Sequence, residues 1–401
     1  MTYANWALTS NAMGKKETNF KQTDIGLIPH DWEVISLGQI GDVKMCKRIF
    51  KSQTKESGEI PFYKIGTFGQ TPDAFIPRSI FEEYKAKYSY PTLGVILLSA
   101  AGTIGRRVKY KGEDAYYQDS NIIWLNHIED KILNDYLYYA YARVKWTTEK
   151  GTAISRLYNK LFLSAKIPQP PIEEQKRIAE VLSHFDEHID NLAALLEKRK
   201  QVKAATMQAL LSGTTRLPGF TAPWIKRTIE QISNRYDNLR VPVAENLRVK
   251  GSTPYYGANG IQGYVQGYTH DGEYVLIAED GANDLSNYPT QYIMGKIWVN
   301  NHAHVLQGKF GQCSTCFLSY ALKTPNYKEI VVGGERAKLN AKNLMEIELF
   351  IPTKLEEQSA IASVLSNMDR GIEALEEQIE KYRQMKEGAM EELLTGKVRL
   401  I

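Results

Sequence analysis

The sequence has few cysteines, no long apolar run and little net charge, and each shortage excludes a class of protein. Three cysteines, Cys46, Cys313 and Cys316, are too few to form a disulfide framework in 401 residues, which favours a reducing compartment over secretion. The apolar stretch at residues 94–101 is far shorter than the ~18 residues of a membrane span, and residues 1–10 lack a signal-peptide core. We therefore expect a cytoplasmic protein of about two to four domains.

The sequence also lacks the common catalytic and cofactor motifs. No Gly-x-x-x-x-Gly-Lys-Ser/Thr loop, His-Glu-x-x-His motif or Gly-x-Ser-x-Gly motif occurs in it. His302, His304, Cys313 and Cys316 could together bind zinc, but their order and spacing match no common zinc finger. We expect His304 on a strand and the two thiols as small apolar fillers. No catalytic residue, metal ligand or cofactor site is predicted in this chain.

The net charge of +4 is too small to indicate nucleic-acid binding by itself, but the charge is unevenly distributed. Residues 20–166 hold 21 Lys and Arg against 16 Asp and Glu, and residues 214–351 hold 14 against 12. Residues 167–213 hold 6 against 7, and residues 352–401 hold 7 against 10. This partition is what two blocks with polyanion-binding surfaces would produce.

A long internal repeat separates the two basic blocks. Residues 172–183 recur as residues 355–366, at a shift of 183 positions, and the match extends to Arg216-Leu217 against Arg399-Leu400. Roughly half of the aligned positions are identical, far more than a shared helical composition would give. The chain is therefore organised as block, repeat, block, repeat.

Each repeat is predicted to form one long helix with a narrow apolar stripe. Gly213 and Gly396 follow the last leucines, where a left-handed residue would end the helix. About 40 residues at a rise of about 1.5 Å make a rod of roughly 60 Å. The stripe residues alternate spacings of four and three, as in a coiled-coil seam: Ile178, Leu182, Phe185, Ile189, Leu192 and Leu196 in the first repeat, and Ile361, Leu365, Met368, Ile372, Leu375 and Ile379 in the second.

Two such stripes most simply cover each other. If the first helix runs from the first block to the second, the other helix leaves the second block and returns, so we expect an antiparallel pair and a pseudo-two-fold relation between the halves. Alternatively, each stripe packs on its own block as an ordinary amphipathic helix, or one seam forms a homodimer.

The blocks combine short strands with short helices, which indicates an α+β fold with two mixed α/β domains. Short apolar runs bounded by Gly, Pro and Asn predict strands over residues 60–66, 92–98, 121–125, 253–256, 273–278 and 296–306. Helices are expected over residues 136–142 and 317–322. Both blocks begin with the same spacing of apolar residues: Trp32, Leu37 and Ile40 in the first, and Trp224, Ile229 and Ile232 in the second.

The blocks carry side chains suited to contact with DNA. Cations near small-residue loops would neutralise phosphates, and amide, Lys and Tyr side chains in loop-rich segments could contact base edges. For any single one, a solvated surface role is equally compatible with the sequence. The candidates are Lys44, Lys47, Arg48, Tyr63, Lys64, Arg106, Arg107, Arg156, Tyr255, Tyr256, Asn259, Gln262, Arg336 and Lys338.

The whole chain resembles the specificity subunit of type I restriction-modification systems. Single motifs are weak, but their order is specific: residues 26–32 (GLIPHDW), 102–105 (GTIG), 170–179 (PPIEEQKRIA), 253–260 (TPYYGANG), 299–305 (VNNHAHV) and 355–358 (LEEQ). The resemblance implies a first target-recognition domain with an N-terminal extension at 1–169, a first conserved-region helix at 170–213, a second domain at 214–351 and a second helix at 352–401. The role of residues 1–19 is not predicted.

The resemblance further implies a non-catalytic subunit that binds double-stranded DNA. Each target-recognition domain would read one half of a split site, and the helical pair would set the spacer between the halves. The partners would be two methyltransferase subunits, with a motor-endonuclease subunit for restriction. S-adenosylmethionine, ATP and Mg would be bound by those partners. A free-standing nuclease and a coiled-coil adaptor that binds only proteins are the alternatives, and neither explains the repeated block plan.

Overall fold

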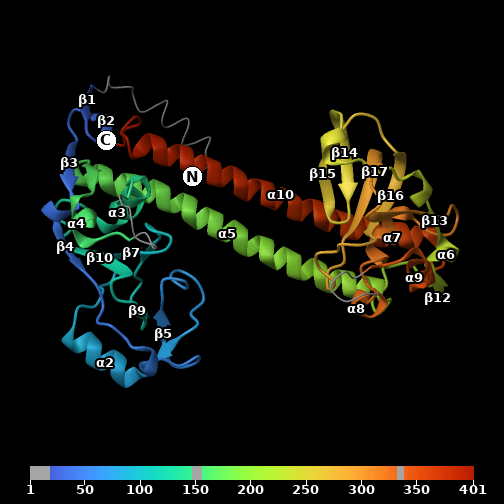
Figure 1. The fold of residues 1–401 in the computed structure, drawn as a ribbon, viewed down its shortest axis with the longest axis horizontal. Coiled ribbons are helices and arrows are strands. Elements are labelled where there is room, and N and C mark those ends of the chain that lie inside the picture. Colours follow the sequence, from blue (N-terminus) through green and yellow to red (C-terminus); the bar gives the residue numbers. More distant parts are fainter. Residues whose placement is uncertain (1–18, 147–155, 332–337) are drawn as a thin grey trace. The chain divides into compact units, whose positions relative to one another are not determined.

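The computed structural model describes residues 19–146, 156–331 and 338–401, which belong to two compact units (Figure 1). Unit 1 comprises Met1–Asn191 and Ile379–Ile401, and unit 2 comprises Leu192–Gln378. Two long helices, α5 (Ile172–Leu211, 40 residues) and α10 (Leu355–Leu393, 39 residues), contribute residues to both units. The predicted pair of helices of about 40 residues is confirmed.

Unit 1 is built from short strands in four small sheets. A four-stranded sheet has the order β4-β10-β7-β8, a three-stranded sheet the order β6-β5-β9, and β1-β2 and β11-β3 form two-stranded pairs. The strands are β1 (Phe20–Thr23), β2 (Gly26–Pro29), β3 (Glu33–Ser36), β4 (Gly41–Lys44), β5 (Ile60–Tyr63), β6 (Phe75–Ile76), β7 (Ile96–Ser99), β8 (Arg107–Lys109), β9 (Tyr116–Tyr117), β10 (Ile122–His127) and β11 (Lys166–Gln169). Its short α-helices are α2 (Arg78–Lys87), α3 (Asn134–Ala140) and α4 (Asn159–Ser164).

Unit 2 joins most of its strands into one six-stranded sheet. The order is β13-β18-β16-β17-β14-β15, and β12 pairs separately with β19. The strands are β12 (Trp224–Thr228), β13 (Ser233–Arg235), β14 (Lys250–Gly257), β15 (Gly260–Val265), β16 (His270–Ala278), β17 (Thr290–Val299), β18 (Ala303–Gly308) and β19 (Glu348–Pro352). The short helices are α6 (Ile229–Ile232), α7 (Thr315–Ala321), α8 (Tyr327–Ile330) and α9 (Ala341–Glu346).

The two units repeat the same connections between their elements. In unit 1, β11, which precedes α5, pairs antiparallel with β3, which follows Trp32. In unit 2, β19, which precedes α10, pairs antiparallel with β12, which begins at Trp224. In each, one pair of strands is parallel: β5 with β9, and β14 with β17. Because connections as well as apolar runs recur, the resemblance between the blocks extends to their topology.

The units differ where unit 1 carries additional chain. Helix α2 lies between β6 and β7, whereas only residues 266–269 separate β15 from β16. Strand β17 continues through ten residues that pair with both β16 and β14, while β8 and β9 are separate strands in separate sheets. The segment 296–306, expected as one strand, is also two strands, because a turn at residues 300–302 separates β17 from β18.

Within each unit, the parts of α5 and α10 that belong to it run antiparallel and touch. In unit 1, Glu174 contacts Arg399 and His188 contacts Tyr382, so rising numbers on α5 meet falling numbers on the returning chain. In unit 2, the same order holds for Lys200 with Glu376, for Lys203 with Asp369, and for Arg216 with Glu357. The predicted antiparallel pairing, and with it the α+β class with two mixed α/β blocks and two long helices, is confirmed.

The apolar stripes pack both on the partner helix and on the block of their own unit. In unit 1, Ile178 and Leu182 share a core with Leu393 of α10 and with Trp32 and Leu37 of the block. In unit 2, Ile361 and Leu365 share a core with Leu210, Leu211 and Phe317. Packing on the partner helix and packing on the helix's own block, which the sequence left open as alternatives, therefore both occur at the helix ends. The structure places the other stripe residues as follows: Leu192 and Ile379 are buried, and Phe185, Ile189, Leu196, Met368, Ile372 and Leu375 are half-buried.

Two smaller expectations concern helix ends and membranes. Gly213 and Gly396 have φ angles of +71° and +69°, the left-handed conformation expected of residues that follow the two long helices. In the part of the chain that the structure describes, no helix is long and apolar enough to cross a membrane. The four domain bounds given above stay a prediction, because each compact unit combines a block with part of both long helices.

Candidate nucleic-acid interface

A buried carboxylate fastens the first block to the long helices in unit 1. Glu174, on the first turn of α5, accepts hydrogen bonds from Trp32 Nε1 (3.0 Å) and from Arg399 Nε (2.8 Å) and Nη2 (2.9 Å). Its side chain is only 1% exposed, and the Arg399 guanidinium also lies over the Trp32 ring. A buried charge is tolerated when it is paired and its hydrogen bonds are satisfied, as this one is.

Unit 2 contains the same arrangement with the roles of the two repeats exchanged. Glu357 accepts from Trp224 Nε1 (3.2 Å) and from Arg216 Nε (2.6 Å) and Nη2 (2.7 Å). In unit 1 the glutamate comes from the first repeat and the arginine from the second, whereas in unit 2 the glutamate comes from the second and the arginine from the first. Each glutamate–arginine–tryptophan group, here called a clamp, therefore needs both repeats.

The glutamine after each clamp glutamate holds the start of a block helix. Gln175 accepts from the backbone N–H of Leu133, which precedes α3, and donates to the carbonyls of Lys131 and Pro170. Gln358 does the same at α7: it accepts from the N–H of Ser314 (2.9 Å) and donates to the carbonyls of Gln312 (3.1 Å) and Pro352 (2.9 Å). Both side chains are fully buried, so the Glu-Gln pair that recurs in the sequence has one structural role in both units.

A third duplicated contact joins an aspartate of one repeat to a lysine of the other. In unit 1, Asp186 accepts from Lys386 and from the hydroxyl of Tyr139 on α3. In unit 2, Asp369 accepts from Lys203 and from the hydroxyl of Tyr320 on α7. The scaffold beneath each block is thus fixed by the same residue types at equivalent positions.

On the first block, loops that are distant in sequence meet at one place, here called the first loop edge: residues 64–70, 101–106, 118–121, Arg48 and Arg156. The N–H of Ile65 donates to Gln118 Oε1 (2.9 Å), and Arg106 Nη1 donates to the Phe68 carbonyl (2.9 Å). Arg156 pairs with Ala101 in an isolated bridge. Hydrogen bonds between the loops therefore define this edge.

Two arginines of the first loop edge converge on one turn. Arg48 Nε donates to Asp119 Oδ2 (2.9 Å), and Arg156 Nη2 donates to the Ser120 carbonyl (3.1 Å). Ser120 has a φ of +56°, a left-handed conformation that no other described residue except glycine adopts. Such backbone strain in a serine persists only where its surroundings hold it, here through its hydroxyl on Asp119 and its carbonyl on Arg156.

The second block has a matching edge, here called the second loop edge: residues 257–262, 280–284, 299–302 and Lys338. Asn259 ties two of its loops together, because Nδ2 donates to the Gly281 carbonyl (2.8 Å) and Oδ1 accepts from the Asn283 N–H (3.1 Å). Gln262 Oε1 accepts from Asn300 Nδ2 (3.3 Å). Asn259 and Gln262, both predicted from the sequence, thus lie on this edge but are engaged in holding its loops.

The two edges occupy equivalent places in their units. The N–H of Gln118 donates to the Tyr63 carbonyl in unit 1, as the N–H of Asn300 donates to the Tyr256 carbonyl in unit 2. Lys338 pairs with Asp280 in an isolated bridge, as Arg156 pairs with Ala101. Each of these cations is followed by a buried leucine, Leu157 or Leu339. The N–H of Leu157 donates to the Ala100 carbonyl, and the N–H of Leu339 donates to the Glu279 carbonyl.

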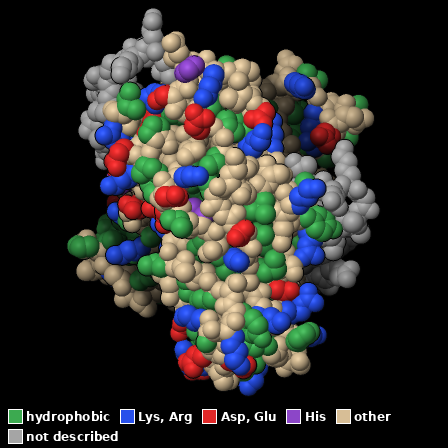
Figure 2. Space-filling model, turned by 90° about the vertical axis from the view of Figure 1, so that its left-hand side faces the viewer, with side chains coloured by type: hydrophobic (Ala, Val, Ile, Leu, Met, Phe, Trp, Pro, Cys, Tyr) green, Lys and Arg blue, Asp and Glu red, His purple; other side chains and the backbone are tan. Residues whose placement is uncertain are grey.

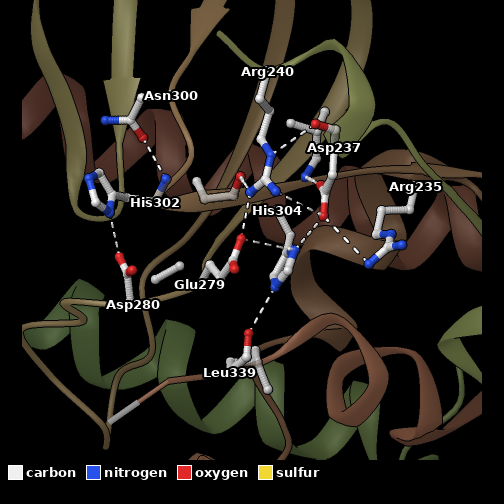
Figure 3. Close-up of polar contacts among 12 residues, drawn as sticks. Arg235, Asp237, Arg240, Glu279, Asp280, Asn300, His302, His304 and Leu339 are labelled. Atoms are coloured by element: carbon white, nitrogen blue, oxygen red, sulfur yellow. Dashed lines mark hydrogen bonds and ion pairs between the residues drawn. The ribbon is translucent and has the colours of Figure 1, made fainter. Parts of the chain in front are cut away.

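Beneath the second loop edge lies a cluster of polar contacts in which His304 is buried and Asp237, Arg240 and Glu279 are partly buried (Figure 3). Arg240 Nη1 donates to Glu279 Oε2 (2.6 Å), and Lys338 Nζ lies 3.0 Å from Glu279 Oε1. His304 Nδ1 lies 2.6 Å from Asp237 Oδ2, and its Nε2 lies 2.8 Å from the Leu339 carbonyl. In unit 1 the place of Glu279 is taken by Ala100, so this charged support belongs to unit 2.

The charges of this cluster follow from its hydrogen bonds. Burial acts to raise the pKa of Asp237, but the hydrogen bond and charge of His304, the Val305 N–H and Arg240 outweigh it and lower that pKa. For Glu279, hydrogen bonds from Arg240 and Lys338 likewise outweigh burial and lower the pKa. Asp237 and Glu279 are therefore carboxylates, and each ring nitrogen of His304 lies beside an oxygen, one of Asp237 and one of the Leu339 backbone.

Three residues of the cluster carry groups that could bind a metal ion. Asp237, Glu279 and His304 are the one group of three possible ligands found close together in the described ranges. Both ring nitrogens of His304 are already within hydrogen-bond distance of an oxygen, and Arg240 and Lys338 already bind Glu279. His304 does lie on a strand, β18, and is 1% exposed, as expected from the sequence. The cluster is a compensated set of ion pairs.

Several predicted DNA contacts need correction. Tyr255 and Tyr256 are 1% and 7% exposed and pack in the interior, so they cannot reach a base without unfolding of β14. The hydroxyl of Tyr255 lies 3.0 Å from the Val243 N–H, and Arg248 covers its ring. The sequence predicts a strand over residues 253–256, which is part of β14, but it does not show that both tyrosine side chains are buried there.

The remaining predicted residues are placed as follows. Lys64 forms an ion pair with Asp73, Lys47 lies over the Tyr88 ring, and Arg107 lies over the Tyr138 ring. Lys44 ends β4, and Tyr63, on β5, is half-buried and stacks on Tyr117. Arg336 lies outside the described residues. Of the fourteen, Arg48, Lys64, Arg106, Arg156, Asn259, Gln262 and Lys338 lie on the loop edges.

Residues that are not among the predicted DNA contacts complete the edges. Gln118, Asp119 and Ser120 form the turn before β10, and in the second edge His302 Nδ1 lies 2.6 Å from Asp280 Oδ1. The sequence contained a signal for these turns, because residues 118–120 and residues 300–302 each come just before an apolar strand, β10 or β18. On the face drawn in Figure 2, Lys and Arg lie interspersed with Asp and Glu, so no continuous basic patch marks a binding surface there.

Comparison with known proteins gives a consistent picture. The family model described as type I restriction modification DNA specificity domain matches residues 29–201 and 222–382. A type I restriction enzyme specificity subunit from Haemophilus influenzae is 54% identical over 154 residues, which cover 38% of this chain and 40% of that protein. The MjaX specificity subunit from Methanocaldococcus jannaschii is 27% identical over 427 residues, covering 96% of this chain and 98% of that protein.

A solved structure shares the fold. The S subunit of a type I restriction-modification system from M. genitalium superposes with a TM-score of 0.67 at 18% identity, covering 90% of this chain and 96% of that one.

Proposed function

The chain belongs to the type I restriction-modification DNA specificity family, and from this premise we propose that it is the subunit that selects the DNA sequence for such a system. Each loop edge would read one half of a bipartite target. The observation that carries this proposal is the pair of equivalent edges on duplicated scaffolds, which differ in the side chains they present. Loops held on a rigid scaffold are where recognition residues usually lie.

The physical basis of recognition would be contact rather than catalysis. Cations such as Arg48, Arg156 and Lys338 would hold phosphates, and amides and other polar groups of the edges would contact bases in a groove. We infer that the chain is itself non-catalytic. Two methyltransferase subunits would modify the target, and motor-endonuclease subunits would cleave unmodified DNA. S-adenosylmethionine, ATP and Mg would be bound by those partners.

The long helices would set the distance between the half-sites. A rise of about 1.5 Å per residue means that one added heptad in each helix lengthens the pair by roughly 10 Å, about three base pairs. A heptad preserves the apolar stripe, so the antiparallel pairing is retained. Such an insertion should lengthen the unread spacer and leave both half-sites unchanged. An altered half-site with a constant spacer would contradict the proposal that the helices set the distance between the half-sites.

The proposal is tested by mapping methylated adenines in cells that contain the methyltransferase with and without this chain. Methylation at one bipartite sequence that appears only with the chain is expected. Methylation that is the same without it would contradict the proposal. Cleavage or methylation by the purified chain alone would favour the free-standing enzyme, and absence of salt-dependent DNA binding by the assembled complex would favour the protein-only adaptor.

A further inference from the structure

Gln118, on the first loop edge, has a side-chain amide that can adopt only one orientation. Its backbone N–H donates to the Tyr63 carbonyl (2.9 Å), and its Oε1 accepts a hydrogen bond from the N–H of Ile65 (2.9 Å). A backbone N–H only donates, so the atom beside Ile65 must be the amide oxygen, and the other end of the amide is the NH2 group. Gln118 is half-buried, and its Nε2 is open to solvent and donates to no acceptor within the described ranges.

In the second loop edge, Asn300 takes the place of Gln118, but it is only 4% exposed and is covered by its own block. Asn300 Oδ1 accepts from the N–H of His302 (2.8 Å; Figure 3), so the NH2 group of Asn300 is the end that lies 3.3 Å from Gln262 Oε1. This donor fixes the amide of Gln262 in turn. The side chain of Gln262 is exposed, and its Nε2 donates to no acceptor in the part of the chain that the structure describes.

The position of the Gln262 amide also depends on Gly257. A Cβ at residue 257 would lie 2.2 Å from Gln262 Nε2, so a larger residue there would push the amide aside. Each edge therefore presents one amide whose oxygen is bound within the protein and whose NH2 group is left to donate. A donor that is held in place before DNA arrives loses less entropy on binding than a free side chain does.

A donor of this kind distinguishes bases in the major groove but not in the minor groove. In the major groove, guanine presents the acceptors N7 and O6, adenine presents N7 and thymine presents O4, whereas cytosine presents only the N4 donor. In the minor groove every base pair presents acceptors, so a single donor there would select nothing. An amide NH2 group that selects sequence must therefore act in the major groove.

Resting on the proposed function, we propose that Gln118 and Gln262 each read one base, Gln118 in one half-site and Gln262 in the other. Each NH2 group donates to an acceptor on a base edge in the major groove. Each amide therefore rejects cytosine at the position that it contacts. The two half-sites are read by the same chemical group, which the first edge presents from the turn before β10 and the second edge from β15.

Gln118→Glu tests this assignment because it reverses the outward polarity and keeps the inner contact. One carboxylate oxygen still accepts from the Ile65 N–H, while the outward atom becomes an oxygen that only accepts. At one position of one half-site, cytosine should rise about five- to thirtyfold relative to the base that the wild type selects. The measurement is methylation by the full chain with its methyltransferase subunits. The probe is a pool of DNA duplexes with the wild-type sequence in one half-site and random bases in the other, and the methylated duplexes are sequenced.

The same change in unit 2 should act on the other half-site. Gln262→Glu keeps an acceptor for Asn300 and should admit cytosine at one position there. Gln118→Met and Gln262→Met remove the amide and add no charge, so each should lose discrimination against cytosine at its own position without gaining a preference for it. The half-site that a variant does not touch should stay as in the wild type, which shows that the variant is folded.

Two glutamines away from the loop edges provide matched controls. Gln39 Oε1 accepts from the N–H of Ser36 (2.8 Å), and Gln231 Oε1 accepts from the N–H of Thr228 (3.1 Å). Both glutamines are exposed and lie just before β4 or β13, whose first residues pair with the last residues of β10 and β18, at the end away from the loop edges. Gln39→Glu and Gln231→Glu add the same charge and should leave both half-sites unchanged.

The outcomes separate this inference from the proposed function. A wild-type complex that methylates a bipartite sequence, with both half-sites unchanged in the Gln118→Glu and Gln262→Glu variants, would overturn the inference and leave the function standing. If a Glu variant is inactive, the Met variant decides, and rejection of cytosine as strong as in the wild type would overturn the inference. A wild-type complex that methylates no bipartite sequence would overturn both.

Discussion

The two units differ most where they are proposed to do different work and least where they are fastened to the long helices. The clamps repeat the same residue types: Glu174 with Arg399 in unit 1, and Glu357 with Arg216 in unit 2. The loop edges do not, since a Gln-Asp-Ser turn in unit 1 stands where Asn300 and His302 stand in unit 2. Buried, mutually dependent contacts tolerate few substitutions, whereas solvent-facing loops tolerate many, so a common scaffold can carry two different recognition surfaces.

The support beneath each edge also differs. In unit 2, Glu279 is partly buried, forms an ion pair with Arg240 and lies 3.7 Å from His304 Nδ1, whereas Ala100 takes its place in unit 1. The first edge depends instead on backbone hydrogen bonds and on the strained turn at Ser120. Equivalent loops can therefore be held either by charge or by backbone geometry, and the two should respond differently to acid.

The largest expected effect comes from breaking a clamp. Glu357→Ala removes the partner of Arg216 and Trp224 and should destabilise unit 2 by about 3–5 kcal/mol, because a paired charge is lost from a buried site. Glu174→Ala should cost a similar amount in unit 1 if the clamps are equivalent. Chemical denaturation measures both, with Glu348→Ala as the control, since Glu348 forms only an exposed pair with Lys226. A clear difference between the two clamp variants would contradict the equivalence.

A smaller effect is expected at the glutamines that hold the block helices. Gln358→Ala leaves the Ser314 N–H and the carbonyls of Gln312 and Pro352 without this partner, which should cost about 1–3 kcal/mol. Gln175→Ala should cost a comparable amount, through α3 rather than α7. Hydrogen exchange of the two short helices would locate the change. Loosening of α3 by the Gln358 variant would show that the contacts do not act within their own units.

The smallest of these effects is expected from the cluster of unit 2, and it should shrink as the pH falls. The pKa values of Asp237 and Glu279 are lowered in the folded protein, so the stabilisation is present above their ordinary pKa values and is lost as pH falls through the folded ones. Asp237→Asn should reduce stability at pH 7 and flatten the acid dependence. Unfolding free energies measured against pH for both proteins test this, and identical slopes would contradict it.

The scaffold could be predicted from the sequence because its signals are periodic and repeated. The stripe that contains Ile178 and Leu182 gave the helices, and the duplicated Glu-Glu-Gln gave their equivalence. Which groups those residues contact could not be predicted, because Glu174 meets Arg399 across 225 positions and only the fold brings them together. A burial pattern gives the face that packs, but not the hydrogen-bond partner.

The loop edges were predicted less well for a physical reason. Arg48 was chosen for its charge, but its partner Asp119 lies 71 positions away, and no local pattern joins them. The sequence predicts a strand at Tyr255 and Tyr256, but not the tertiary contacts that bury both side chains. Residue types indicated the chemistry of the edges, and only tertiary contacts decided which side chains remain exposed.

The most direct test of separate recognition by two loop edges is a methylation map of cells in which residues 20–166 alone are exchanged for the corresponding block of another family member. Both clamps and the second loop edge are then still present if the exchanged block retains the tryptophan that binds Glu174. The account predicts that one half of the methylated sequence changes while the other half and the spacer stay the same. A change in both halves, or in neither, would contradict it.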